Sequence, residues 1–584
     1  MIPKIIFGRD PEEVAIDTTK ESSKRPMQTS NSTTRPIGWW SPQNRPPEIG
    51  ADAISAAIRR VAEPACVVDV DGQPAIGRGG CVTIDSARTH VGGPTDGYPV
   101  LGYIPALHPE DLGDPYFKHS FGLRYPYVIG AMANGITSVK MVESAARAGM
   151  IGFFGAAGLA LEDIETAIVQ LRQRVIDLPF GFNLIHSPNE PDLEAATVDL
   201  YLKHAICRIS ASAYLDLTLP LVYYRIKGIH RGADGRVVSP NHVTAKVSRV
   251  EVARKFFSPP PEKILRQLLD RNMITPAEAE LARTVPLAET MTAEADSGGH
   301  TDNQPAISLL PTMLALRDRM AESFRYDRPL CVGLGGGIAT PAAVSAAFAL
   351  GAAYVLTGSV NQACLEAGTS ATVRSMLAEA CQADVTMAPA ADMFEMSVKV
   401  QVLKRGTLFP FRAAKLFDLY CRYGSLEEIP QKDRLILERD LFRRPVDEEW
   451  EQTKAFFRLR DPQQIERAAK DPKHKMALVF RSYLGQSSNW ANSGDPARKI
   501  DYQIWCGPSM GAFNEWTRGS FLERPENRSV VTVALNLLIG AAVATRFNWL
   551  RAQKVVMSPD AGKFRPLPLE EIVSLIDRES TQSA

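Results

Sequence analysis

The chain has 584 residues, of which 45% are hydrophobic and 23% are charged, the balance of a globular protein. Its 66 Lys and Arg residues equal its 66 Asp and Glu residues, and zero net charge argues against bulk nucleic-acid binding, which needs a basic surface. The 8 cysteines include no CxxC pair, so the sequence predicts neither a zinc site nor a disulfide framework and favours a reducing cytoplasm.

The two ends of the chain carry little sign of a membrane or export segment. The N-terminus, MIPKIIFGRDPEEV, has no apolar run long enough for a signal peptide. Residues 17–48 are rich in Thr, Ser, Pro and Arg and predict a flexible arm over 1–48, followed by a cap region over 49–124. The apolar segment 529–545 is shorter than the ~20 residues that span a bilayer and contains Asn536, so a buried helix is favoured and no membrane insertion is expected.

Between residues 125 and 400, short apolar runs alternate with helical patterns, which predicts a parallel sheet. The helix at 138–149 has Ser138 as its N-cap and Gly149 as its stop. Eight such units indicate an α/β fold, a (β/α)8 TIM barrel, rather than a doubly wound sheet, because the first unit lacks a GxGxxG turn. The predicted strands are 125–132, 150–155, 179–185, 205–212, 242–248, 290–296, 330–336 and 353–359, with further helices at 161–175, 191–204, 305–322 and 340–350.

An insertion of about residues 251–288 separates the fifth strand from the sixth. It contains three consecutive prolines and two short helical patterns. These features predict an inserted helical lid over the barrel mouth or a cap on its side.

The loops after the last two strands, GLGGGIAT and TGSV, predict a phosphate site. Residues 329–365 carry no charged side chain. Glycines let backbone N–H groups approach phosphate oxygens, and a helix N-terminus behind each loop favours the negative charge. Phosphates often bind at these two loops of a TIM barrel, so we read the uncharged stretch as barrel wall and buried helix; a tight turn without ligand is the alternative.

Two histidines follow predicted strands at the catalytic end of the barrel. His300 follows the sixth strand and two glycines, where an imidazole can exchange a proton with a substrate near neutral pH. His186 follows the third strand and is the second candidate. For each, a loop histidine that only packs or hydrogen-bonds is the alternative.

Three charged residues occupy neighbouring predicted strands. Glu294 and Asp296 share one face of the sixth strand and can contact the hydroxyls of a cofactor or serve as barrel carboxylates. Lys246 lies on the fifth strand, where its ammonium can offset negative charge on a ligand or pair with one of these carboxylates.

Residues 401–584 read as a helical C-terminal domain in which no chemistry of its own is visible. Near its start stands a basic run without acidic residues, which is either a solvated surface or a patch that steers an acidic partner. The run contains Lys399, Lys404, Arg405, Arg412 and Lys415.

The chain resembles the FMN-dependent nitronate monooxygenase (2-nitropropane dioxygenase-like) superfamily through GAMANGI, GFNL, EADSGGHTD, GLGGGIAT and VLTGS, in that order. The longer stretches PFGFNLIHSPNEP, VNQACLEAGTS, MAPAADMFEMSVKVQVLKRGTLFP and DYQIWCGPSMGAFNEW look like its PfaD-type branch. The resemblance covers roughly residues 90–550.

This resemblance implies a barrel that binds FMN. His300 matches the active-site histidine, and Asn183 would bond the pyrimidine edge of the flavin. The chain departs from the superfamily at Ser359, Val360 and Asn361, where many members have a loop that contains Thr and Arg. The resemblance therefore implies no contacts for this loop beyond the phosphate. The residues implied for the cofactor are Gly335, Gly336, Gly337, Gly358 and Ser359 at the phosphate and Ala131, Met132 and Asn134 at the ring, with Lys246 and Glu294 as further candidates.

The PfaD-type branch consists of trans-acting enoyl reductases that serve polyunsaturated fatty acid synthases and polyketide synthases. The resemblance therefore implies that NADPH or NADH reduces FMN, which passes hydride to a 2-enoyl thioester on an acyl carrier protein. A nitronate-type flavin oxidase and a non-catalytic synthase component are the alternatives. A homodimer is one expectation for the oligomeric state.

Overall fold

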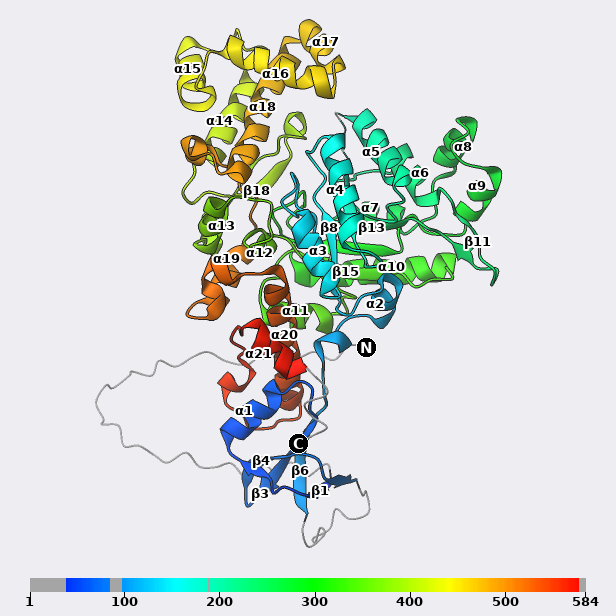
Figure 1. Cartoon of the computed structure of the whole chain (residues 1–584), viewed down its shortest axis with the longest axis vertical. Coiled ribbons are helices and arrows are strands. Elements are labelled where there is room, and N and C mark those ends of the chain that lie inside the picture. Colours follow the sequence, from blue (N-terminus) through cyan, green and yellow to red (C-terminus); the bar gives the residue numbers. More distant parts are fainter. Residues whose placement is uncertain (1–37, 85–96, 187, 189, 577–584) are drawn as a thin grey trace, which may run out of the picture.

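The structure, a computed structural model, describes residues 38–84, 97–186, 188 and 190–576. Its centre is a closed barrel of eight strands in which every neighbouring pair is parallel (Figure 1). All eight lie where the sequence predicts them, which confirms the (β/α)8 barrel. The strands, in order around the barrel, are β7 (Tyr127–Ile129), β8 (Ile151–Phe154), β9 (Gly181–Ile185), β10 (Arg208–Ser212), β13 (His242–Val247), β14 (Thr290–Glu294), β15 (Cys331–Gly335) and β16 (Val355–Thr357).

The helices between these strands begin at the predicted caps. The Ser138 hydroxyl accepts a hydrogen bond from the N–H of Met141 at the start of α3 (Val139–Arg147), and Thr340 caps α11 (Pro341–Ala349) through the N–H of Ala343. Each cap satisfies a backbone donor that the first helical turn leaves without an intrahelical partner. The other helices of this region are α4 (Leu161–Arg174), α5 (Pro191–Lys203), α6 (Leu219–Ile226), α7 (Val250–Phe256), α10 (Ala306–Phe324), α12 (Ser359–Gln362) and α13 (Ala371–Ala378).

A short helix, α2 (Pro115–Phe121), closes the end of the barrel at which the strands begin. Phe117 stacks on the ring of Tyr354, just before β16, with ring centroids 4.3 Å apart. The guanidinium of Arg208, the first residue of β10, lies over the ring of Phe121. Aromatic side chains therefore pack at this end of the barrel, whereas the cavity described below lies at the opposite end.

The insertion after the fifth strand lies on the flank of the barrel. Its helices α8 (Glu262–Asp270) and α9 (Pro276–Ala282) pack against α6, and α9 also contacts the hairpin of β11 (His230–Arg231) and β12 (Val237–Val238). The structure describes all of residues 251–288, and none of them lines the cavity described below. The insertion is therefore a side cap, and the predicted lid is wrong.

The residues before the barrel form an antiparallel six-stranded sheet (blue in Figure 1) against which α1 (Ala51–Arg59) packs. Trp40 is fully buried in it, so the last residues of the predicted arm belong to folded structure; residues 1–37 lie outside the described residues. The strands, in spatial order, are β2 (Glu48–Ile49), β4 (Gln73–Gly77), β3 (Ala65–Val70), β6 (Tyr98–Ile104), β1 (Trp39–Ser41) and β5 (Cys81–Thr83).

After the barrel, a hairpin of β17 (Val385–Pro389) and β18 (Lys399–Leu403) leads into a bundle that we call the helical unit, residues 409–493. The unit has a hydrophobic cluster of its own, in which Phe409 and Leu416 meet Phe480 and Leu484. It lies beside the barrel in Figure 1 (yellow to orange). Its helices are α14 (Phe409–Arg422), α15 (Gln431–Ile436), the π-helical turn η4 (Leu437–Phe442), α16 (Val446–Arg460), α17 (Gln463–Lys470) and α18 (Pro472–Ser493).

The last helices return to the barrel. The helix α20 (Val530–Ala552) is long and apolar enough to cross a membrane, but 78% of its most apolar window is buried against the rest of the protein. It packs against α11, and Arg546 reaches the carbonyls of Ala57, Val61 and Glu63 beside the N-terminal sheet. The buried helix predicted at 529–545 is thus confirmed. The predicted helical region 401–584 holds the helical unit and, separately, α19 (Ser509–Thr517), α20 and α21 (Leu569–Ile576), whose residues join the barrel core.

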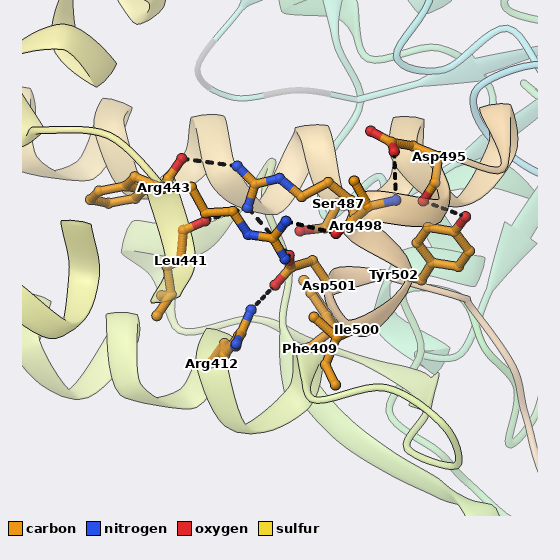
Figure 2. Close-up of polar contacts among 12 residues, drawn as sticks. Phe409, Arg412, Leu441, Arg443, Ser487, Asp495, Arg498, Ile500, Asp501 and Tyr502 are labelled. Atoms are coloured by element: carbon orange, nitrogen blue, oxygen red, sulfur yellow. Dashed lines mark hydrogen bonds and ion pairs between the residues drawn. The ribbon is translucent and has the colours of Figure 1, made fainter. Parts of the chain in front are cut away.

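A buried carboxylate fixes the exit from the helical unit. Figure 2 shows Asp501, which has no solvent exposure, among the guanidinium groups of Arg412, Arg443 and Arg498. Arg498 also donates to the carbonyls of Leu441 and Phe442. The network joins α14 and η4 to η5 (Pro496–Asp501), and so positions the segment that follows η5.

Candidate active site

A cavity of about 640 Å³ lies at the carboxyl ends of the barrel strands. Loops of the barrel form its floor, while α16, α18 and the segment 503–509 form the opposite wall. Its volume is in the range of sites for cofactors and small ligands, and its place is where TIM-barrel enzymes carry their active sites.

The two predicted phosphate loops line this cavity. Gly336 and Gly337 have φ angles of +87° and +74°, which favour glycine. A Cβ on Gly336 would lie 2.7 Å from the carbonyl carbon of Ala295, whereas a Cβ on Gly337 or Gly358 would meet no atom within 4 Å. Gly336 therefore allows two loops to pack closely, while Gly337 and Gly358 border open space.

Polar groups of the same loops face that space. Among the described residues, none accepts a hydrogen bond from the backbone N–H of Gly337 or Ser359. The Ser359 hydroxyl oxygen accepts from the N–H of Gly507 at 3.0 Å, which leaves the hydroxyl hydrogen to donate. Gly335 ends β15 and also lines the cavity. Free donors around an open space fit a phosphate.

Residues after the first barrel strand and within the third line the cavity: Ala131, Met132 and Asn134 follow β7, and Asn183 lies in β9. The Asn134 side chain donates to the Ser488 hydroxyl of α18 and so connects the barrel to the helical unit. The Asn183 amide nitrogen donates to the Ser210 carbonyl at 3.1 Å and to the Ser212 hydroxyl at 2.8 Å. This orientation leaves the Asn183 amide oxygen as the acceptor that a ligand can use.

A salt bridge joins two strands inside the cavity. Lys246 Nζ lies 2.8 Å from Glu294 Oε1, and the side chains are 16% and 5% exposed. The Ser297 hydroxyl donates to the same carboxylate oxygen at 3.2 Å. Asp296 instead accepts from Gln401 of β18 at 2.6 Å and does not line the cavity.

His300 lies on the cavity wall and is paired with a carboxylate. Its Nε2 lies 3.1 Å from Oδ1 of Asp392, which also lines the cavity. Burial alone would lower the pKa of His300, but the negative charges of Asp392 and Glu294 raise it above its ordinary value. The ring can therefore hold a proton at a pH where a free histidine has lost it.

His186 is oriented differently. Its Nδ1 lies 3.0 Å from Glu194 Oε2, its ring stacks on Tyr214 with centroids 5.3 Å apart, and it is absent from the cavity lining. The ring packs against α5 and the loop after β10, and it meets the cavity only through Glu194, which lines it, so a catalytic role for His186 stays an untested prediction.

Comparison with known proteins adds the family. The model of the nitronate monooxygenase family matches residues 117–416, just over half of the chain. The chain belongs to the nitronate monooxygenase family. Residues 423–502 of this family member match the inserted helical domain of acyl-carrier-protein S-malonyltransferase.

Several relatives share more than the barrel. The chain is 45% identical over 448 residues to a component of the polyunsaturated fatty acid synthase of Thraustochytrium sp., covering 76% of this chain and 30% of that protein. It is 45% identical over 435 residues to the polyketide biosynthesis protein PksE of Bacillus subtilis, covering 74% of this chain and 56% of that protein. The chain thus spans less than three fifths of the length of these curated relatives.

A solved structure gives the same relationship. The enoyl reductase domain of MlnA, from the macrolactin biosynthesis cluster of Bacillus amyloliquefaciens, is 39% identical with a TM-score of 0.71. The match covers 76% of this chain and 99% of that domain. These similarities confirm the resemblance to the PfaD-type branch of the nitronate monooxygenase family.

The wall that faces the barrel was not predicted from the sequence. Asp392 comes from the β17–β18 hairpin, Arg460 from α16 and Arg481 and Gln486 from α18. Arg460 reaches across the cavity rim to Glu190 of the barrel, with nitrogen–oxygen distances of 2.6 and 3.1 Å. The C-terminal region therefore contributes side chains to the cavity wall, which the sequence alone did not predict.

The basic run does not form an open cationic patch. Arg412 pairs with Asp501, Lys415 with Asp433 at 2.7 Å, and Arg405 with Glu379 at 3.4 Å. Because three of its five cations have acidic partners, the run has little charge left for steering a partner.

The described residues contain no group of three or more metal-binding side chains. All 8 cysteines are free thiols. The site is therefore built from backbone donors, two amides, a salt bridge and a histidine–aspartate pair.

Proposed function

We propose that this chain is an FMN-dependent enoyl reductase that acts in trans on 2-enoyl thioesters carried by an acyl carrier protein, in the synthesis of polyunsaturated fatty acids or polyketides. NADPH or NADH would be the reductant, and the cytoplasm the compartment. The observation that carries the proposal is the 39% identity to the MlnA enoyl reductase domain over 99% of that domain. The match covers 76% of this chain, which is more than the barrel alone.

The cavity residues fit FMN. The open space at Gly337 and Gly358, with the donors of Ser359 beside it, suits the phosphate. The free amide oxygen of Asn183 can accept from an N–H on the pyrimidine edge of the ring, and the Lys246 ammonium can offset negative charge there. When bound, FMN would supply hydride transfer from the nicotinamide to the enoyl substrate.

The remaining chemistry falls to the chain's own groups. Reduction of a 2-enoyl thioester adds a hydride at the β-carbon and a proton at the α-carbon. His300 is the candidate proton donor, because it lines the cavity and its pKa is raised. The Glu294 carboxylate holds the Lys246 side chain in place at 2.8 Å.

The carrier-bound substrate would enter past α16. Among the described residues that line the cavity, Gln452, Phe456 and Asn489 of the helical unit are exposed. Phe456 is 54% exposed, and Leu459, one turn further along α16, is 93% exposed. We therefore place the carrier protein on this rim rather than on the basic run.

The decisive experiment compares two activities of the purified, FMN-reconstituted protein. We expect anaerobic NAD(P)H oxidation that depends on crotonyl thioester, and no turnover of a nitronate with oxygen. Nitronate turnover without enoyl reduction would assign the protein to the oxidase activity of its family instead.

Two further results would contradict the proposal. Failure to bind FMN would point to a non-catalytic synthase component. Normal FMN content in Gly337→Asp would refute the phosphate assignment, because that carboxylate enters the space given to the phosphate.

A further inference from the structure

The partner of His300 comes from outside the barrel. Asp392 stands between β17 and β18, yet its Oδ1 lies 3.1 Å from His300 Nε2. The two side chains are 23% and 32% exposed, and both line the cavity. Among the described residues, none hydrogen-bonds to His300 Nδ1, so the second ring nitrogen is left for a ligand.

The helical unit fixes the backbone on either side of Asp392. Arg481 of α18 donates through Nε to the carbonyl of Ala391 at 2.8 Å, and its NH1 lies 3.3 Å from Glu395. Two side-chain contacts therefore hold the hairpin loop at the cavity wall. They favour one position of the Asp392 carboxylate.

The surrounding charges stabilise the charged form of both partners. For His300, burial lowers the pKa, Asp392 and then Glu294 raise it, and Lys246 opposes them, with a net upward shift. For Asp392, burial raises the pKa, but the His300 imidazolium and the Arg481 guanidinium lower it, with a net downward shift. The pair is thus an imidazolium and a carboxylate over a wider pH range than either group alone would be.

We propose that Asp392 is a positioning residue for enoyl reduction, holding His300 through Nε2 and keeping Nδ1–H for the substrate. The inference rests on the proposed function. Hydride addition to the β-carbon, with NAD(P)H as the ultimate donor, leaves the thioester as its enolate. His300 transfers the Nδ1 proton to the α-carbon and becomes neutral, Asp392 stays ionised, and water returns the proton.

The variant Asp392→Asn tests this role, because it keeps the size of the side chain and removes its charge. We expect kcat/KM for crotonyl thioester to fall about 10–100-fold, the usual effect of removing a carboxylate that orients a metal-bound histidine. The alkaline limb of the pH profile should move to lower pH, because the proton-donating form of His300 is lost earlier. Asp392→Glu should restore part of the activity.

A matched control is Asp302→Asn. Asp302 lies two residues beyond His300, pairs with Arg249 at 2.7 Å, and does not line the cavity. Its removal should leave the pH profile unchanged. A wild-type pH profile in Asp392→Asn would overturn the proposal.

A second measurement does not depend on activity. The rate at which diethyl pyrocarbonate modifies His300, followed by peptide mass spectrometry across pH, reports the neutral fraction of the ring. Asp392→Asn should react several-fold faster at pH 7 than wild type, and equal rates would overturn the role of Asp392. If the wild-type protein reduces no enoyl thioester, the proposed function fails, while this measurement still decides whether Asp392 sets the proton on His300.

Discussion

Removing the carboxylate of Asp501, which lies in η5 just after the helical unit, should strongly destabilise the contacts between η5 and that unit. Its Oδ2 lies 3.2 Å from Arg498 and 3.3 Å from Arg443, and Oδ1 pairs with Arg412 and accepts from the Tyr483 hydroxyl at 2.8 Å. Asp501→Ala leaves three guanidinium groups without their shared carboxylate. Two of them, Arg412 and Arg498, are only 17% and 9% exposed in their side chains, so water cannot fully replace it.

Breaking a buried ion pair by removing one partner costs ~3–5 kcal/mol, and we expect Asp501→Ala to lower the free energy of unfolding by that amount. Asp501→Asn keeps hydrogen-bonding atoms and should lose less, about 1–3 kcal/mol. Urea unfolding followed by tryptophan fluorescence gives the difference.

The matched control is Asp433→Ala. Asp433 pairs with Lys415 at 2.7 Å, and the two side chains are 31% and 33% exposed. An exposed pair of this kind contributes ~0–1 kcal/mol. If Asp501→Ala is no more destabilising than Asp433→Ala, the reasoning about the buried charge is refuted.

Three other predictions concern the site. Gly358 has a φ of −128°, and a Cβ added there would meet no atom within 4 Å, so Gly358→Ala should change the free energy of unfolding by less than ~0.5 kcal/mol. The same variant should weaken FMN retention, and unchanged flavin content would argue against the phosphate at this loop. Leu459→Asp should raise the KM for a carrier-bound enoyl substrate but not for a small soluble thioester. The control Lys404→Glu/Arg405→Glu should change the KM for neither substrate. Equal loss of activity on both substrates in Leu459→Asp would indicate a folding defect. His300→Ala should leave flavin reduction by NADPH nearly intact and slow enoyl-dependent reoxidation by ~10²–10⁴-fold in stopped-flow absorbance, and wild-type reoxidation would exclude His300 as the donor.

The barrel could be predicted because its signals are local. Parallel strands buried on both faces read as continuous apolar runs, and glycines in the last two loops mark the open space at Gly337 and Gly358. The location of His300 beside the cavity could be predicted for the same reason, since its position after a strand is visible in the sequence. His186 satisfied the same rule, yet its ring pairs with Glu194, stacks on Tyr214 and does not line the cavity, and no local pattern reveals that.

The cavity wall opposite the barrel depends on contacts between distant segments. Asp392 reaches His300 only after a hairpin returns over the barrel mouth, and Arg460 reaches Glu190 only after α16 packs beside it. The sequence did not reveal that the basic run is paired, because the acidic partners of Arg412 and Lys415 lie elsewhere in the chain. Hydrophobic periodicity predicts a helix but not which helix face meets a site.

The return of α20 to the barrel limits how this chain can be divided. A Cβ on Gly540 would lie 2.5 Å from the ring of Pro341, so α20 and α11 pack with almost no gap. The family match ends at residue 416, but a fragment cut there would expose the apolar face of α11 and should aggregate. On the ribosome, the same face stays uncovered until residues 530–552 emerge, so α20 is the element that covers α11 during synthesis.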